Sequence, residues 1–190
     1  MAEGLERTSE RNGMDTLNDL DKLAQKYGAD KWGKHHYTPV YYDLFKDRRN
    51  EVKKILEIGV AEGASLFMWR DFFPNARING ADNDFKRVIA LANKEPIRVY
   101  PCDQSNYKDL DDLLKETGTD IDLFVDDGSH IPSHQARTCL HVFPQLKKGA
   151  IYIIEDIANE SIMVDFPSDW NCKLLRVGSR YDDRLIICQK

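Results

Sequence analysis

The chain has 190 residues, of which 42% are hydrophobic and 31% charged, and its formal net charge is −5. These values are typical of one globular domain with a buried core, and no apolar run approaches the roughly 18 residues that a transmembrane helix needs. The scattered lysines and arginines argue against a nucleic-acid-binding surface. The four cysteines lack a C-x-x-C spacing and no apolar signal core begins the chain, so we expect reduced thiols in a cytoplasmic protein.

The N-terminal part divides into a polar stretch, a helix and an aromatic segment. Residues 1–16 show no apolar periodicity, and we expect a flexible tail there. Apolar residues at helical spacing predict a helix over 17–27, which Gly28 would end. The segment from there to Tyr42 is dense in aromatic, glycine and ionisable residues. Two interpretations stay open for it: a helix connector whose rings pack on a sheet, or a lid over cofactor and substrate. In the second interpretation the residues that would face a ligand are Trp32, His35 and Tyr37.

Residues 52–84 have the pattern of the first half of a nucleotide-binding βαβ unit. A short apolar run at 55–58 predicts a buried parallel strand, and residues 76–81 predict a second one. Between them, residues 66–73 predict a helix with Ser65 as its N-cap. A helix start behind a glycine turn offers free N–H groups to a ligand that approaches the backbone closely.

The glycines and acids of this unit indicate which nucleotide it would bind. The dinucleotide fingerprint G-x-G-x-x-G is absent, and Glu57, Gly59 and Gly63 form the pattern E-x-G-x-x-x-G instead. Carboxylates at this turn would repel a diphosphate and suit a cationic ligand such as S-adenosylmethionine. Asp82 follows the second strand, with Asn83 beside it, where an acid can accept hydrogen bonds from a ribose diol. The pattern resembles the first motif of class I S-adenosylmethionine-dependent methyltransferases; the alternative is a purely structural turn.

Polar residues also follow the third predicted strand. We expect a helix over 85–93, this strand over 97–102 and an acidic helix over 107–116. Asp103 and Gln104 come directly after the strand. They could hydrogen-bond an adenine edge or cap a loop, and the residue types alone leave both roles open.

The fourth and fifth predicted strands each end in a pair of acids. Residues 121–125 lead into Asp126 and Asp127, and residues 150–154 lead into Glu155 and Asp156. Buried charges are costly unless they bind something, and ligands of open α/β sheets bind at the carboxyl ends of the strands. Oxygen ligands suit Mg²⁺ or another hard divalent ion. The alternative is that one acid of each pair caps a loop or helix.

One histidine lies beside these acids. His130 follows the first pair closely, and a histidine next to a carboxylate metal site is a natural general base. The alternative is an ordinary loop histidine.

The last two predicted strands, at 170–177 and 185–189, are joined by a hairpin turn. The fold class that follows is α/β: a Rossmann-like domain with a mostly parallel seven-stranded sheet, a C-terminal antiparallel hairpin and helices on both faces. We expect this domain to cover residues 17–190, with its N-terminal helices and lid at 17–50.

Five motifs in order then point to a family. They are Y-G-A-D-K-W-G-x-H-x-Y-T-P-x-Y, L-E-I-G-V, D-Q-S, D-D-G-S-H and E-D. Together they resemble the metal-dependent sugar O-methyltransferases of macrolide biosynthesis, the mycinamicin and tylosin enzymes, which are related to the cephalosporin hydroxylase-like group. The similarity covers about residues 23–157. It implies S-adenosylmethionine as cofactor, Mg²⁺ held by Asp127, Glu155 and Asp156, and His130 as the base acting with Asp127. The residues assigned to the cofactor are Glu57, Gly59, Gly63, Ser65, Asp82, Asn83, Asp103, Gln104, Asp126 and Tyr37.

The resemblance implies methyl transfer to a hydroxyl of a sugar or polyol-containing small molecule. A catechol-type metal-dependent methyltransferase and a non-catalytic nucleotide-binding or assembly protein are the alternatives. The macrolide enzymes carry an additional N-terminal domain that the sequence here does not include, and the segment after the fifth strand is short. The acceptor therefore rests on analogy. A homo-oligomer stays open.

Overall fold

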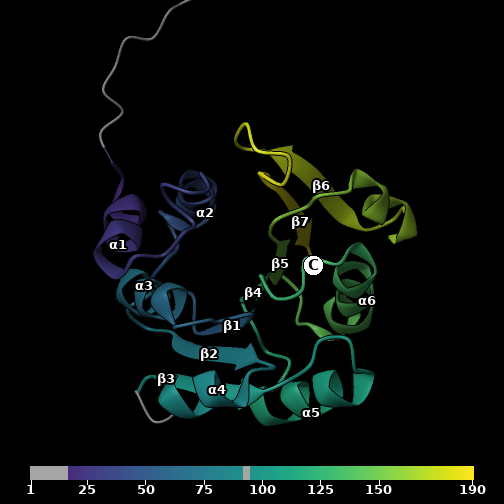
Figure 1. The fold of residues 1–190 in the computed structure, drawn as a ribbon, viewed down its shortest axis with the longest axis horizontal. Coiled ribbons are helices and arrows are strands. Elements are labelled where there is room, and N and C mark those ends of the chain that lie inside the picture. Colours follow the sequence, from purple (N-terminus) through teal and green to yellow (C-terminus); the bar gives the residue numbers. More distant parts are fainter. Residues whose placement is uncertain (1–16, 92–94) are drawn as a thin grey trace, which may run out of the picture.

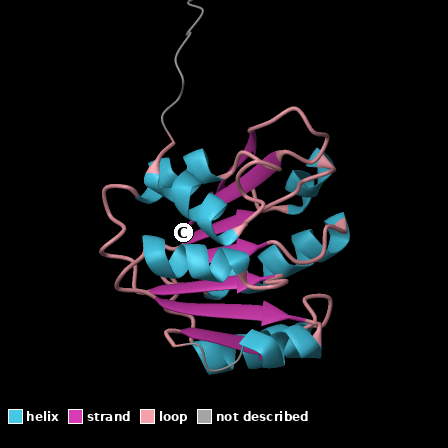
Figure 2. Ribbon diagram, turned by 60° about the vertical axis from the view of Figure 1, so that its left-hand side comes forward, coloured by secondary structure: helices cyan, strands magenta, loops and turns pink. Residues whose placement is uncertain are grey.

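One mixed sheet organises the computed structural model of this chain, which describes residues 17–91 and 95–190. The strand order is β3-β2-β1-β4-β5-β7-β6, and helices cover both faces (Figure 1, Figure 2). The expected Rossmann-like architecture is thus confirmed. The tail expected at residues 1–16 lies outside the described residues. None of the helices in the described part of the chain is long and apolar enough to cross a membrane.

Strands and helices alternate along most of the chain. The strands are β1 (Lys54–Ile58), β2 (Arg77–Asp82), β3 (Ile97–Pro101), β4 (Leu123–Asp126), β5 (Ile151–Ile154), β6 (Asn171–Arg176) and β7 (Arg184–Gln189). The α-helices are α1 (Asp19–Tyr27), α2 (Thr38–Phe45), α3 (Ala64–Phe72), α4 (Phe85–Leu91), α5 (Tyr107–Thr117) and α6 (Pro132–Val142), and two short 3-10 helices are η1 (Phe143–Gln145) and η2 (Glu160–Asp165). Strands β1 to β5 run parallel, whereas β7 pairs antiparallel with both β5 and β6.

The central strands are apolar because both of their faces are covered. Every residue of β4 and β5 is buried, as expected for interior parallel strands. Successive side chains point to opposite faces, so Val125 packs in the layer with α1, α2 and α3, and Phe124 packs in the layer with α5 and α6. In β4 and β5 the acids therefore lie at the carboxyl ends, as Asp126 at the end of β4 and Glu155 directly after β5.

The start of α3 corrects one expectation. The helix begins at Ala64, its N-cap position is Gly63 with a φ of +81°, and no side chain caps it. Ser65 therefore lies inside the first turn, and its assignment as N-cap is wrong. The physical reason is that the left-handed glycine turn ends directly at the helix, which leaves no extended residue between them.

The cysteines correct another expectation. Cys172 and Cys188 form a disulfide, whereas we expected reduced thiols throughout. The two residues are direct partners in the antiparallel ladder of β6 and β7, so their side chains meet although they lie 16 residues apart in the sequence. Cys102 and Cys139 are free and buried.

Helix α1 is fixed to α3 by a cluster of charged and phenolic groups. Asp71 of α3 accepts hydrogen bonds from the Tyr27 hydroxyl and from Lys26 Nζ at 2.9 Å, and it contacts Arg70 at 2.8 Å. These partners, the Tyr27 hydroxyl first, lower the pKa of the Asp71 carboxyl to about 2. The cluster holds the end of α1, from which the aromatic segment departs.

Replacing Asp71 with asparagine tests this link. Because the folded pKa lies below the ordinary value near 3.8, the charged form stabilises the protein above that value, and the gain is lost as the pH falls toward about 2. We expect Asp71→Asn to lower the free energy of unfolding at pH 7 by about 1 kcal/mol, since the site is partly exposed and solvent screens it. Urea unfolding at pH 7, 5 and 3 should show a constant difference between pH 7 and 5 and a smaller one at pH 3.

The matched control is Asp112→Asn, which removes a surface carboxylate paired with Lys108 in the same helix. It should leave the unfolding midpoint nearly unchanged. A difference for Asp71→Asn that stays equal at pH 3 would contradict the charge argument and indicate a packing effect.

Candidate active site

Two adjoining cavities lie at the carboxyl ends of the parallel strands. The larger one has a volume of about 620 Å³ and borders the ends of β1, β2, β4 and β5 and the loop after β3. The smaller one, of about 280 Å³, lies between the first glycine turn and the segment after α1. Asp30, Gly59, Ala61 and Asp127 line both cavities. The site therefore lies where β1 and β4 meet and the chain order reverses, the usual ligand position in open α/β sheets.

Two glycines make this close assembly of loops possible. Gly59 has a φ of +85°, and a Cβ added there would overlap the backbone carbonyl of Asp127. A Cβ added to Gly128 would overlap the side-chain oxygen of Gln104. The turn after β1 thus packs against the loop after β4 at Gly59, and the loop after β4 packs against the loop after β3 at Gly128. Any larger residue at either position would prevent this contact.

The acid expected at the end of β2 is held by the glycine turn. Asp82 is buried, its Oδ2 accepts the backbone N–H groups of Val60 and Ala61 at 3.1 Å, and its Oδ1 accepts that of Asp84 at 2.8 Å. Asp82 and Asn83 both line the larger cavity. The carboxylate is therefore oriented before any ligand arrives.

The polar residues after β3 do two things at once. Asp103 accepts hydrogen bonds from the N–H and hydroxyl of Ser105, which caps the loop, and it also lines the larger cavity. Gln104 lines the same cavity and donates to Asp126 Oδ1 at 2.9 Å. Asp126 lines neither cavity, and burial raises the pKa of its carboxyl to about 7.

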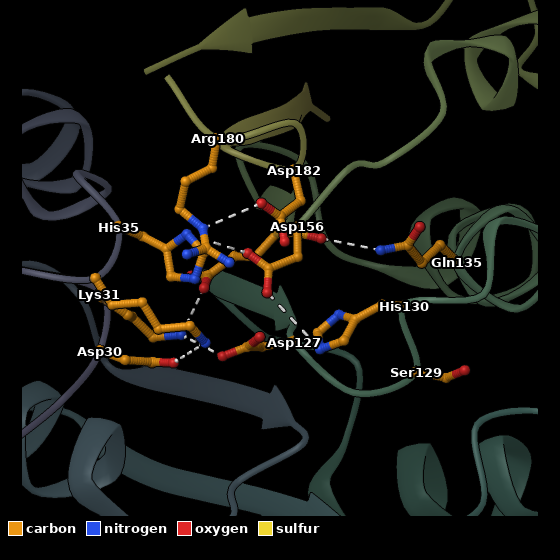
Figure 3. Close-up of polar contacts among 12 residues, drawn as sticks. Asp30, Lys31, His35, Asp127, Ser129, His130, Gln135, Asp156, Arg180 and Asp182 are labelled. Carbon is orange, nitrogen blue, oxygen red and sulfur yellow. Dashed lines mark hydrogen bonds and ion pairs between the residues drawn. The ribbon is translucent and has the colours of Figure 1, made fainter. Parts of the chain in front are cut away.

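Three of the expected chemical groups meet at the cavity. Asp127, His130 and Asp156 lie close together (Figure 3), and each offers a ligand atom within 4.8 Å of the others. All three line the larger cavity. His130 Nε2 lies 3.7 Å from Asp156 Oδ2, and the His130 side chain is 52% exposed. Asp156 has a φ of +54°, a conformation that is uncommon outside glycine and often marks a functional position.

Glu155 lies behind this group. It is buried, its Oε2 accepts from Lys31 Nζ at 2.7 Å, and its Oε1 accepts from the Tyr41 hydroxyl at 2.6 Å. Both of its oxygens thus have protein partners, and Glu155 lines neither cavity. The structure brings together Asp127 and Asp156 of the expected metal ligands and sets Glu155 apart from them.

The segment after α1 supplies Lys31, which sequence reasoning did not single out, and Tyr37, which it assigned to the cofactor. Lys31 Nζ contacts Glu57 at 3.1 Å, Asp127 at 2.7 Å and Glu155 at 2.7 Å. The Tyr37 hydroxyl donates to Asp156 Oδ1 at 2.6 Å, and Tyr37 lines neither cavity. His35 and Tyr37 are buried and Trp32 is half-buried, and none of the three lines either cavity. Gly28, Ala29, Asp30 and Lys34 of the same segment do line the cavities. The segment packs as a connector, and its role as a lid stays a prediction.

Of the remaining residues assigned to the cofactor, some line a cavity and others are buried away from both cavities. Gly59 and Ser65 line the smaller cavity. Glu57 is fully buried, accepts from Trp69 Nε1 at 2.8 Å and lines neither cavity. Gly63 forms the turn itself. Asp30, which lines both cavities, is among the cavity residues that sequence reasoning missed. It lies in an aromatic segment that gives no periodic signal.

The donor set fits a hard divalent ion. Asp127 and Asp156 are carboxylates on a shared cavity wall, and the imidazole of His130 stands beside them. Burial raises the pKa of the Asp127 carboxyl, while the neighbouring Lys31 ammonium acts in the opposite direction.

Comparison with known proteins decides the relationship. No family model matches the chain. It is 37% identical over 148 residues to mycinamicin VI 2''-O-methyltransferase of Micromonospora griseorubida, and 37% identical over 148 residues to demethylmacrocin O-methyltransferase of Streptomyces fradiae. The chain is a homologue of these sugar O-methyltransferases. Each match covers 73% of this chain and 36% of the relative, so the chain spans about a third of the length of these relatives.

Solved structures agree with this relationship. The MycE methyltransferase of the mycinamycin pathway, in complex with Mg, SAH and mycinamycin VI, matches with a TM-score of 0.73 and 28% identity over 91% of this chain and 54% of that chain. A methyltransferase of Podospora anserina matches with a TM-score of 0.61 at 16% identity, over 100% of this chain and 99% of that chain. The second likeness shows the fold alone.

The glycine contact between β1 and β4 can be tested with a matched pair of variants. Gly59 and Gly149 both have a φ of +85°, but a Cβ meets the Asp127 backbone at Gly59 and nothing within 4 Å at Gly149. We expect Gly149→Ala to cost about 1 kcal/mol of stability from the backbone conformation alone, and Gly59→Ala to cost at least about 3 kcal/mol because the loop after β4 must move. Urea unfolding measures both, and equal costs would contradict the close contact.

Proposed function

We propose that this chain transfers a methyl group from S-adenosylmethionine to a hydroxyl of a sugar-bearing small molecule, with a divalent metal ion. The observation that supports this most directly is the meeting of Asp127, His130 and Asp156 on the wall of a cavity at the carboxyl edge of the sheet. The homology to sugar O-methyltransferases supports the reaction class. The sugar acceptor is proposed by analogy with these relatives, which are longer than this chain.

The two cavities suit the two ends of the methyl donor. Asp82, with a carboxylate already oriented by the turn, would accept the ribose hydroxyls in the larger cavity. Asp103 and Gln104 would border the adenine ring. The smaller cavity, with Gly59 and Ser65 in its wall, would take the amino acid end. Asp127 borders both, so the reacting centre would lie beside it.

The metal would be held by Asp127 and Asp156, with Glu155 as the third expected ligand. A divalent ion bound there lowers the pKa of a hydroxyl that it contacts, as metals do for bound water. His130 is half exposed toward the cavity and takes the hydroxyl proton at Nε2. The acceptor oxygen then forms a bond to the donor methyl while the carbon–sulfur bond breaks and S-adenosylhomocysteine leaves. Holding both reactants in line supplies much of the rate.

The finer partner assignments rest on composition and analogy. The absence of a nucleic-acid or membrane partner, a homo-oligomeric state and a cytoplasmic location stay predictions of the sequence. A catechol-type acceptor is the competing substrate class, and an acceptor panel of sugar glycosides and catechols separates the two.

The cofactor assignment predicts the effect of removing the acid at the end of β2. Calorimetric titration of S-adenosylmethionine should show micromolar binding to the wild-type chain and binding at least tenfold weaker to Asp82→Ala, a loss of at least about 1.4 kcal/mol. The control is Asp84→Asn, two residues further on, which lines neither cavity. It should bind as the wild type does. An absence of binding to the wild type would overturn the transferase proposal.

The metal and base assignments predict different kinetic losses. His130→Ala should lower kcat by about 10²- to 10⁴-fold, the usual share of a general base, while cofactor affinity stays the same. Asp127→Asn should abolish the response of activity to Mg²⁺. The measurement is methyl transfer to the best acceptor of the panel, with Mg²⁺ and with chelator. Undiminished activity of Asp127→Asn in chelator would rule out the metal role.

A further inference from the structure

A buried ammonium group lies among the acids of the site. Among the residues that the structure describes, Lys31 is the only lysine or arginine that is buried. Its Nζ atom contacts carboxylates at the ends of three strands: Glu57 of β1, Asp127 after β4 and Glu155 after β5. Figure 3 shows it approaching Asp127 from the N-terminal segment. No step of the proposed reaction uses this lysine, so its position needs a separate explanation.

The charges around Lys31 do not balance. Three acids contact Lys31, and Asp156 lies beside one of them, Asp127, so one buried ammonium stands among four carboxyl groups. Uncompensated charge in a protein interior is strongly unfavourable. A divalent ion and the sulfonium of the methyl donor would both add positive charge next to these acids. Lys31 thus supplies a positive charge among these acids at all times, whereas the metal ion and the methyl donor would supply theirs only when bound.

The hydrogen bonds show which carboxylate oxygens already have a donor from the protein and which face the cavity without one. Asp127 gives Oδ2 to Lys31, and Asp156 gives Oδ1 to Tyr37, so Oδ1 of Asp127 and Oδ2 of Asp156 are left for a ligand in the cavity. Glu155 gives one oxygen to Lys31 and the other to Tyr41. If Glu155 bound a metal ion, the ion would share an oxygen with one of these two donors.

We propose that Lys31 is a positioning residue that competes with the divalent ion for Asp127 and Glu155 and so holds the metal affinity of the site low. The inference rests on the proposed metal site. Lys31 keeps the acids in place and neutralises part of their charge when the metal is absent. The same positive charge repels an arriving cation and occupies oxygens that the cation needs.

Lys31→Met tests this role, because methionine retains much of the side-chain volume and removes the charge. We expect titration of MgCl₂ by calorimetry to give a dissociation constant at least tenfold lower than that of the wild type. Thermal unfolding should show a lower midpoint in chelator and a larger upward shift on adding Mg²⁺ than the wild type shows. Lys31→Arg, which keeps the charge, should restore the metal affinity to near the wild-type value.

The matched control is Lys46→Met, directly after α2. Lys46 lines neither cavity and is paired with Asp43, so its loss should change the Mg²⁺ dissociation constant by less than twofold. A Lys31→Met protein with unchanged or weaker Mg²⁺ binding, or one destabilised equally with and without Mg²⁺, would overturn the proposal and leave Lys31 a purely structural group.

A second pair of variants covers the case in which Lys31→Met does not fold. Lys31→Met with Glu155→Gln removes one positive and one negative charge and so keeps the balance of the buried set. It should bind Mg²⁺ several-fold more tightly than Glu155→Gln alone, because Asp127 is still freed from its competitor; equal affinity would contradict the proposal. Failure of the wild-type chain to bind Mg²⁺ would instead remove the metal site itself, which is a distinguishable result.

Discussion

The contacts of the Lys31 ammonium join the N-terminal segment to the ends of three strands. Glu57, Asp127 and Glu155 come from separate parts of the chain, and each would be costly to bury as a charge without a partner. A single cation between them lowers that cost and fixes how the strands β1, β4 and β5 present their acids. The position of the segment between α1 and α2 depends on the same contacts, which makes it part of the site as well as part of the core.

The acids at this edge accept hydrogen bonds on their buried side, and their other side faces the cavity. The hydroxyls of Tyr37 and Tyr41 and the ammonium of Lys31 donate to oxygens on the buried side, while the cavity side faces His130. Burial raises the pKa of Tyr41 well above its ordinary value, so its hydroxyl stays a donor to Glu155. Side chains that stabilise the fold therefore also orient the acids of the candidate site, and such preorganisation is typical of catalytic sites.

The fold by itself does not select the reaction. A methyltransferase at 16% identity shares the architecture with a TM-score of 0.61, and one such sheet can support many acceptors. The proposed reaction rests instead on the grouping of Asp127, His130 and Asp156 beside two adjoining cavities. Asp156 reaches this grouping through a left-handed backbone conformation, a local cost that the hydrogen bond from Tyr37 helps to offset.

The sequence by itself determined the sheet and the place of the site. Interior parallel strands read as short apolar runs because both faces are buried, and the acids that interrupt these runs had to lie at the carboxyl edge. Only the tertiary structure decided which acids face the cavity. Lys31 meets Asp127 across 96 residues and Glu155 across 124 residues, and Cys172 meets Cys188 through strand register. Contacts over such separations leave no periodic pattern in the sequence. They depend on strand order and register in the folded sheet, whereas periodicity reports only local structure.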